Sequence, residues 1–417
     1  MPAVQPAANT LPTKVILLDP NGEFSNWSQR LKLAGCQWDV FSIDDYETLI
    51  NQLTTANYDA IFLAYDLKTS RKAELLRRTK QQSPRTLRFQ LGLKAESSDE
   101  KNVRQELLHR TFDMPVNFPH IQQSVEHLLK VRRLLFRSPL QKIIQQRGQI
   151  QHPNYIKGLF EAVAVIGDSQ DHMAYVLEND EALSAQIIKW VNTPYFGEHA
   201  AVFGVSDLTN KINLRRLRGL IILANLYRTY PAHTNWTLFS FERLIHRSLL
   251  VAQLAYDIAK DAKLDNTYCE QSYLAGLLHD TGIMVLASLF PTKYRDMLRS
   301  MEKHTQALHN AEKAAFGMFH GEIAAALIMH WYVPPRVTEA ILFHSLPMLS
   351  DDKRFTPLTA VHIADTLLPS VWKSGESEMR SQLSQPYLTR TEQHAHLHRW
   401  KLLATHYRSY LRQQPTS

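Results

Sequence analysis

The chain has 417 residues, of which 44% are hydrophobic and 21% are charged, and its formal net charge is +7. This length exceeds what one hydrophobic core usually supports, so we expect two domains. No apolar run reaches the roughly 18–20 residues needed to cross a bilayer. Met1 to Thr13 lacks the basic and apolar segments of a secretory signal. Membrane insertion is therefore not expected, residues 1–12 are interpreted as a disordered leader, and the expected location is cytoplasmic.

The two cysteines, Cys36 and Cys269, lie far apart in the sequence, and neither belongs to a CxxC pair. A disulfide framework or a thiolate metal site is therefore not expected. The positive charge is modest for a chain of this length, so it permits contact with a nucleotide or an acidic partner without requiring one. Nucleic-acid binding would rest on charge alone and is not expected.

Residues 13–135 alternate between short apolar strands and helices. Residues 14–18 are aliphatic and lead into Asp19 and Pro20, as a buried strand followed by a turn does. The expected strands are 14–18, 38–43, 58–64 and 86–93 with one further short strand, and the expected helices are 27–35, 46–54, 72–81, 99–109 and 121–135. This alternation predicts an α/β domain of the flavodoxin-like type, built around a parallel sheet.

This order of elements resembles the receiver domain of bacterial response regulators. In that family an acidic pair holds magnesium, an aspartate at the end of the third strand accepts the phosphoryl group, and a lysine senses it. Here Asp19 matches one acidic residue and Pro20 replaces the other, while Ala64 stands at the acceptor position and Met114 at that of the lysine. Phosphoryl transfer needs a carboxylate and a metal, so the resemblance implies a receiver-like module that is not phosphorylated. A slipped register would offer Asp66 as the acceptor, and that alternative stays open.

From Ser138 onward the apolar residues recur at helical spacing, and strand-like alternation is largely absent. Helices are expected at 155–165, 173–177, 182–191, 214–230, 241–260, 267–279, 321–331 and 335–343. Short loops join most of them, so the sequence predicts an all-α bundle over residues 138–370. Residues 371–417 are polar and are expected to form a helical extension and a frayed tail.

Five segments of this helical part resemble the HDOD family, a branch of the HD superfamily of metal-dependent phosphohydrolases that is found in bacterial signalling proteins. They are 178–197, 208–220, 272–286 with the His-Asp dipeptide, 316–334 and 337–347. Five ordered segments are more specific than one short motif. The resemblance implies an HD-type helical bundle that is generally regarded as regulatory.

The resemblance also implies a set of metal ligands. In active HD enzymes the ligands follow one another as His, then His-Asp, then further histidines, then Asp. The residues that fill this order here are His246, His279, Asp280, His320, His344 and Asp365. Imidazoles and carboxylates together suit iron, manganese, zinc or magnesium. A divalent metal is therefore the candidate cofactor and Asp280 the candidate catalytic residue. A single histidine in an apolar helix is more often a hydrogen-bonded core residue, so metal binding stays open.

Two departures argue against catalysis. The related HD-GYP phosphodiesterases have a lysine where Ile283 stands here and a second histidine where Ser345 follows His344. An isoleucine cannot donate to a phosphoryl oxygen, and the loss of one such contact costs roughly 100- to 1000-fold in rate. Arg215 and Arg216 are candidate residues for binding a phosphate or nucleotide, although a solvated helix edge is the simpler interpretation.

The sequence thus predicts a bacterial signal-transduction protein related to two-component systems. Its HDOD domain is expected to be a non-catalytic output or adaptor domain, controlled through the phosphorylation-deficient receiver-like module. The alternative is a metal-dependent HD-type phosphohydrolase or phosphodiesterase that acts on a nucleotide or cyclic dinucleotide. Signalling proteins, not identified by the sequence, are the expected partners. A homodimer and a nucleotide ligand stay open.

Overall fold

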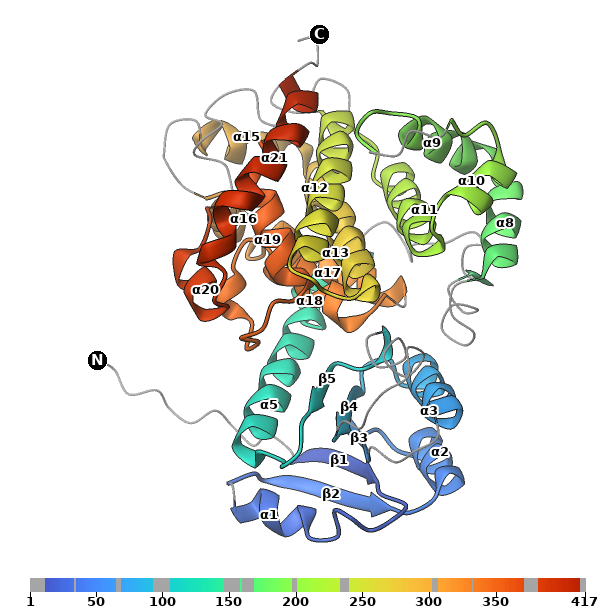
Figure 1. Ribbon diagram of the computed structural model, residues 1–417, viewed down its shortest axis with the longest axis vertical. Coiled ribbons are helices and arrows are strands. Elements are labelled where there is room, and N and C mark those ends of the chain that lie inside the picture. The colour runs from blue at the N-terminus through green and yellow to red at the C-terminus, as the bar shows by residue number, and fades with distance from the viewer. Residues whose placement is uncertain are drawn as a thin grey trace. The chain divides into compact units, whose positions relative to one another are not determined.

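The computed structural model describes residues 12–33, 35–64, 69–92, 106–145, 158–159, 169–196, 201–232, 240–301, 307–331, 333–370 and 382–412. The chain divides into two compact units, Met1–Arg133 and Leu134–Ser417 (Figure 1). The expected leader, Asp66, and most of the helices expected at 99–109 and 155–165 lie outside the described residues.

The N-terminal unit contains a five-stranded parallel sheet with the strand order β2-β1-β3-β4-β5. Its strands are β1 (Thr13–Leu18), β2 (Trp38–Ile43), β3 (Ala60–Ala64), β4 (Leu87–Leu91) and β5 (Arg110–Phe112). In the register, Val15 on β1 lies between Val40 on β2 and Ala60 on β3. This is the flavodoxin-like order of a doubly wound sheet, which confirms the predicted fold class.

Helices cover both faces of this sheet, α1 (Trp27–Leu33) and α5 (Phe118–Leu135) on one, α2 (Tyr46–Thr55) and α3 (Thr69–Gln82) on the other (Figure 1). Successive residues of a strand point to opposite faces. Leu17 and Phe62 therefore contribute to the core under α1 and α5. Ile16 and Ile61 contribute to the core under α2 and α3. Burial on both faces explains why these strands read as continuous apolar runs.

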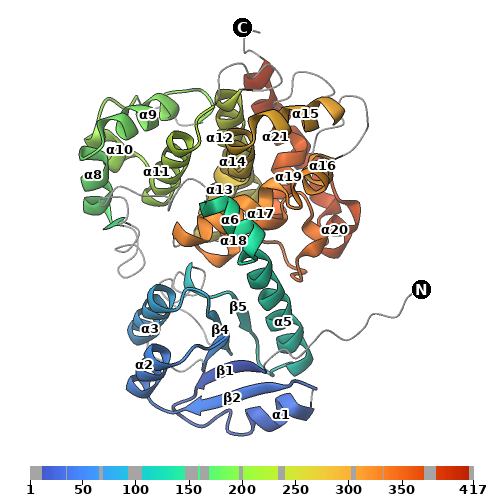
Figure 2. The ribbon, with the colours of Figure 1, turned by 180° about the vertical axis from the view of Figure 1, so that it is seen from behind.

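The described residues of the second unit form helices joined by turns and loops, with no strands among them. Its helices are α6 (Ser138–Gln145), α8 (Gln170–Glu178), α9 (Glu181–Val191), α10 (Val205–Lys211), α11 (Leu214–Thr229), α12 (Phe241–Asp261), α13 (Asn266–Leu278), α14 (Thr281–Leu289), α15 (Pro291–Met301), α16 (Leu308–Phe316), α17 (His320–Ile328), α18 (Pro335–Phe343), α19 (Pro357–Leu367), α20 (Gln385–Arg390) and α21 (Leu397–Arg412). The short α6 lies against α17 (Figure 2). The predicted all-α architecture is confirmed.

Helices α12 and α13 pack closely at the centre of this unit. A Cβ atom at Gly276 on α13 would lie 2.8 Å from the Cα atom of Ala252 on α12, so the close approach requires glycine. The stretch Asn266–Leu289 is long and apolar enough to cross a membrane by length and composition, but 94% of its most apolar window is buried. It consists of α13 and α14, which are core helices of the bundle.

The C-terminal helix α21 packs on α12 and α19. The side chain of Trp400 is fully buried, and its Nε1 donates a hydrogen bond of 3.0 Å to Asp261 on α12. The hydroxyl of Tyr407 donates to Asp257, one turn earlier on α12. Residues 397–410 therefore contribute to the packing of the helical unit.

Candidate functional site

The His-Asp dipeptide forms the junction between two core helices. α13 ends at Leu278 and α14 begins at Thr281, so His279 and Asp280 lie at the turn between them. A Cβ atom at Gly282 would lie 2.0 Å from the carbonyl oxygen of His320. Only glycine allows this contact, which brings the start of α14 against the start of α17 and the dipeptide next to His320.

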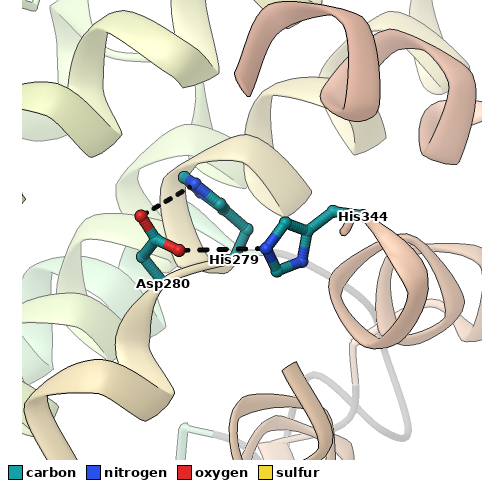
Figure 3. Close-up of side chains that lie close together, drawn as sticks. All are labelled: His279, Asp280 and His344. Carbon is teal, nitrogen blue, oxygen red and sulfur yellow. Dashed lines mark ion pairs between the residues drawn. The ribbon is translucent and has the colours of Figure 1, made fainter. Parts of the chain in front are cut away.

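Three histidines surround the carboxylate of Asp280. Its Oδ2 lies 3.1 Å from His279 Nε2, and its Oδ1 lies 3.7 Å from His320 Nε2 and 3.8 Å from His344 Nε2. Figure 3 shows His279 and His344 reaching this carboxylate from two different helices. The Nε2 atoms of His320 and His344 are 3.1 Å apart. The structure thus brings together four of the six predicted ligands, and Asp365 Oδ1 joins them 3.5 Å from His279 Nε2.

The other ring nitrogen of each histidine faces an acceptor. The Nδ1 atoms lie 2.7 Å from the Gly276 carbonyl for His279, 2.6 Å from a Glu312 carboxylate oxygen for His320, and 2.8 Å from the Ile341 carbonyl for His344. Such contacts fix the orientation of ligating histidines. They turn all three Nε2 atoms towards Asp280. Glu312, on α16, is itself fully buried and accepts a hydrogen bond of 2.8 Å from the Tyr294 hydroxyl.

An arginine that was not expected from the sequence lies at the centre of this site. Arg247 Nη2 donates to Asp365 Oδ1 at 2.7 Å, and its Nη1 donates to Asp280 Oδ2 at 3.3 Å. The same Nη1 lies 3.4 Å from His279 Nε2. We call Arg247, His279, Asp280, His320, His344 and Asp365 the HD cluster. Arg247 stands in an apolar helical stretch of the sequence, where an arginine is rarely buried unless it is paired. This position could have indicated that Arg247 pairs with buried carboxylates.

The predicted ligand His246 is not brought to the HD cluster. Its ring stacks on Tyr195, with the centroids 4.3 Å apart and the planes at 20°. Successive residues of a helix point about 100° apart, so α12 directs Arg247 to the cluster and His246 elsewhere. The order of residues in the sequence predicted His246 as a ligand, but the geometry of α12 brings Arg247 to the cluster instead.

The two arginines considered as phosphate-binding residues lie on α11. The guanidinium of Arg216 is buried and donates to Glu270 at 3.0 and 3.3 Å. It lies between the rings of Tyr256 and Tyr273, 4.6 Å from each centroid. In this arrangement Arg216 has a structural partner in Glu270. The backbone N–H of Arg215 donates to Asn213, which caps the start of α11.

The charges of the HD cluster shift the pKa values of its members. Burial alone would lower the pKa of His279, but Asp280 and Asp365 raise it to about 9. Burial would raise the pKa of both carboxyl groups, yet His279 and Arg247 hold each of them below its usual range. Burial, with the neighbouring His279 and His320, lowers the pKa of His344 to about 3. The positive charges of Arg247 and His279 thus balance the negative charges of Asp280 and Asp365.

Part of the HD cluster has the geometry of a metal site. His279, Asp280 and His344 offer donor atoms that all lie within 4.8 Å of one another. Asp280 Oδ1, His320 Nε2 and His344 Nε2 are separated by 3.1 to 3.8 Å. Metal–donor bonds of about 2.0–2.1 Å in a tetrahedral site place donors about 3.4 Å apart. These three atoms therefore fit a divalent metal ion.

Comparison with known proteins matches part of the helical unit to a family. Residues 151–347 match the HDOD domain family. The crystal structure of an HDOD domain protein from Geobacter sulfurreducens has a TM-score of 0.50 at 18% identity, covering 68% of this chain and 99% of that one. A Marinobacter aquaeolei VT8 protein named for signal transduction has a TM-score of 0.45 at 18% identity over 80% of both chains.

A curated relative from Treponema pallidum (strain Nichols) is 25% identical over 169 residues, which are 40% of this chain and 32% of the relative. The chain thus spans about a third of the length of that relative. The structural similarity to the Geobacter sulfurreducens protein, at 18% identity, concerns the fold alone. The chain therefore contains an HDOD domain in residues 151–347, and its N-terminal unit is an α/β domain built on a parallel sheet.

Proposed function

We propose that this HDOD-domain protein regulates bacterial signal transduction by binding other signalling proteins in the cytoplasm, and that its HD cluster stabilises the domain without turning over a phosphate ester. The observation that carries the proposal is the burial of the HD cluster. Its most exposed side chain, that of Asp280, has a relative exposure of 11%. A substrate phosphate would have to pass between packed helices to reach that carboxylate.

The pairing of both carboxylates supports the same conclusion. Arg247 donates to Asp280 Oδ2 and to Asp365 Oδ1, so one oxygen of each carboxylate that would hold a reacting water or a second ion is already paired with a cation of the chain. Ile283 is 2% exposed and lies in the core. It has no polar atom with which to stabilise phosphoryl charge, a contact worth roughly 100- to 1000-fold in rate.

The N-terminal unit is proposed to be a receiver-like module that is not phosphorylated and that serves as an input or dimer contact. Both carboxylate oxygens of Asp19 accept backbone hydrogen bonds, from Glu23 at 3.1 Å and from Phe24 at 2.7 Å. β3 ends at Ala64, which is buried and has no side-chain nucleophile. These contacts give Asp19 a role in shaping the loop that follows β1.

A hydrolysis assay tests the proposal. The full chain is loaded in turn with Mn²⁺, Fe²⁺, Zn²⁺ and Mg²⁺ and incubated with cyclic dinucleotides, nucleoside monophosphates and bis-p-nitrophenyl phosphate. We expect no turnover above that of buffer with the same metal. Metal-dependent turnover at ordinary enzymatic rates that disappears in Asp280→Asn but persists in His246→Ala would overturn the proposal.

The second candidate function is a metal-dependent phosphohydrolase acting on a nucleotide or cyclic dinucleotide. One observation favours it, namely that Glu312 orients His320 as a carboxylate orients a metal-ligating histidine. When bound, a divalent ion would polarise a phosphoryl oxygen and acidify a water. This candidate requires a path to Asp280, so it predicts that hydrolysis appears in the assay above.

A further inference from the structure

The HD cluster has two halves that share the carboxylate of Asp280. In the first half, Oδ2 faces His279 Nε2 at 3.1 Å and Arg247 Nη1 at 3.3 Å. In the second half, Oδ1 faces His320 Nε2 at 3.7 Å and His344 Nε2 at 3.8 Å. The two halves differ in where their positive charge comes from.

The first half already contains a cation. Besides its contacts with Asp280 and Asp365, Arg247 donates from Nη2 to the Asp365 carbonyl and from Nε to the Pro369 carbonyl, both at 2.8 Å. A guanidinium is always charged in a protein, and these contacts fix its position. A divalent ion between His279, Asp280 and Asp365 would lie beside this charge in a buried site, where like charges repel strongly.

The second half has the donors for a cation but no guanidinium. Among the described residues, the side chains that Arg247 contacts are His279, Asp280 and Asp365, and its other hydrogen bonds are with backbone carbonyls. The Nε2 atoms of His320 and His344 lie only 3.1 Å apart, while their Nδ1 atoms face Glu312 and the Ile341 carbonyl. Two imidazole nitrogens that face each other at this distance need a proton or a metal ion between them.

We infer that Arg247 takes the place of one divalent ion between His279, Asp280 and Asp365, and that a single ion binds in the second half, at Asp280 Oδ1, His320 Nε2 and His344 Nε2. The inference concerns the site of the proposed function and rests on the same description of an internally paired cluster. The cluster then contains two kinds of cation, the guanidinium of Arg247 and a divalent ion taken up from solution.

Titration with Co²⁺ tests this assignment. The full chain is stripped with a chelator and titrated with Co²⁺, its visible absorption is followed, and bound metal is measured after desalting. We expect one equivalent in the wild type and two in Arg247→Ala. Adding Asp365→Asn to Arg247→Ala returns the count to one. The matched control His246→Ala, next to Arg247 on α12, keeps one equivalent.

Zero equivalents of Co²⁺ in the wild type would overturn the inference, because a proton would then bridge the two histidines. Two equivalents in the wild type would also overturn it. A count of one in folded Arg247→Ala would also overturn it. If that variant does not fold, Asp365→Asn alone decides: one equivalent supports the inference, and fewer contradicts it. One equivalent together with hydrolysis would refute the proposed function but not this inference. Two equivalents in the wild type without hydrolysis would refute this inference but not the proposed function.

Discussion

The two units use their carboxylates in different ways. In the N-terminal unit, Asp19 accepts two backbone N–H bonds and the neighbouring strand ends in apolar Ala64. In the helical unit, Asp280 and Asp365 are buried and share Arg247. A buried ionised group is costly unless it is paired. A site can therefore lack reactivity because its polar groups are missing or because its carboxylates are already paired with a cation of the chain. The stability of the second kind of site, the HD cluster, should be far more sensitive to the loss of one charged side chain.

The largest effect is expected from Arg247→Met. This change leaves two buried carboxylates without their guanidinium, and breaking a buried pair in this way costs about 3–5 kcal/mol. Urea unfolding of the metal-free protein at pH 7 measures the loss. The control is Arg243→Met, at a partly exposed arginine on the same helix. If the two variants lose equal stability, Arg247 does not pair the carboxylates.

Alkaline pH should weaken the helical unit nearly as much. The pKa of His279 is raised to about 9 in the folded chain, against about 6.5 when unfolded. A group that binds its proton more tightly when folded stabilises the fold fully below pH 6.5, and this stabilisation disappears as pH rises towards 9. The loss is on the order of 3 kcal/mol. Urea midpoints between pH 6.5 and 9 with a chelator present measure it.

Replacing His279 by glutamine should flatten that pH dependence, since the titrating group is gone, while His246→Ala should leave it intact. A wild-type midpoint that does not change over this range would show that His279 is not held protonated by its carboxylate neighbours.

A smaller effect is expected at the start of α17. Arg137 Nη2 donates to Glu322 Oε2 at 2.6 Å and to the Gly317 carbonyl at 3.2 Å, where α6 meets α17 (Figure 2). Glu322 is 2% exposed, so Arg137→Ala should cost about 1–2 kcal/mol and speed hydrogen exchange in the first turn of α17. The exposed Arg299 on α15 provides the control, and equal exchange in Arg137→Ala and Arg299→Ala would refute this role.

The smallest effect is expected in the N-terminal unit. Acetyl phosphate with Mg²⁺ should leave the mass of the full chain unchanged, because β3 ends in Ala64 and the carboxylate of Asp19 is already engaged. Intact-mass spectrometry detects a single phosphoryl group. An acid-labile adduct would show that a carboxylate in this unit accepts phosphate, and its loss in Asp66→Asn would favour the slipped register.

Much of the fold could be predicted because the local signals agreed. The aliphatic run before Asp19 is β1, and α9 ends at Val191 as expected, where Asn192 exchanges hydrogen bonds of 2.7 and 3.0 Å with the backbone of Val202. α14 was missed because Thr281–Ser288 is buried on every side, so it lacks the amphipathic pattern that marks a surface helix.

The site was predicted in part, for a geometric reason. The order of histidines and aspartates indicated which residues meet at Asp280, and the structure brings His279, His320 and His344 there. Sequence order could not decide between His246 and Arg247, because adjacent residues face different sides of a helix. Only the rotation of α12 in the packed bundle determines which of the two reaches the cluster.

The central claim is that the HD cluster is held together by its own charges, and a double-mutant cycle between Arg247 and Asp365 tests it most directly. Unfolding free energies are measured for the wild type, Arg247→Met, Asp365→Asn and the double variant, all free of metal. Residues in one buried network couple by roughly 0.5–3 kcal/mol. We predict a coupling of about 2–3 kcal/mol for this pair. Additive effects of the two substitutions would contradict the account.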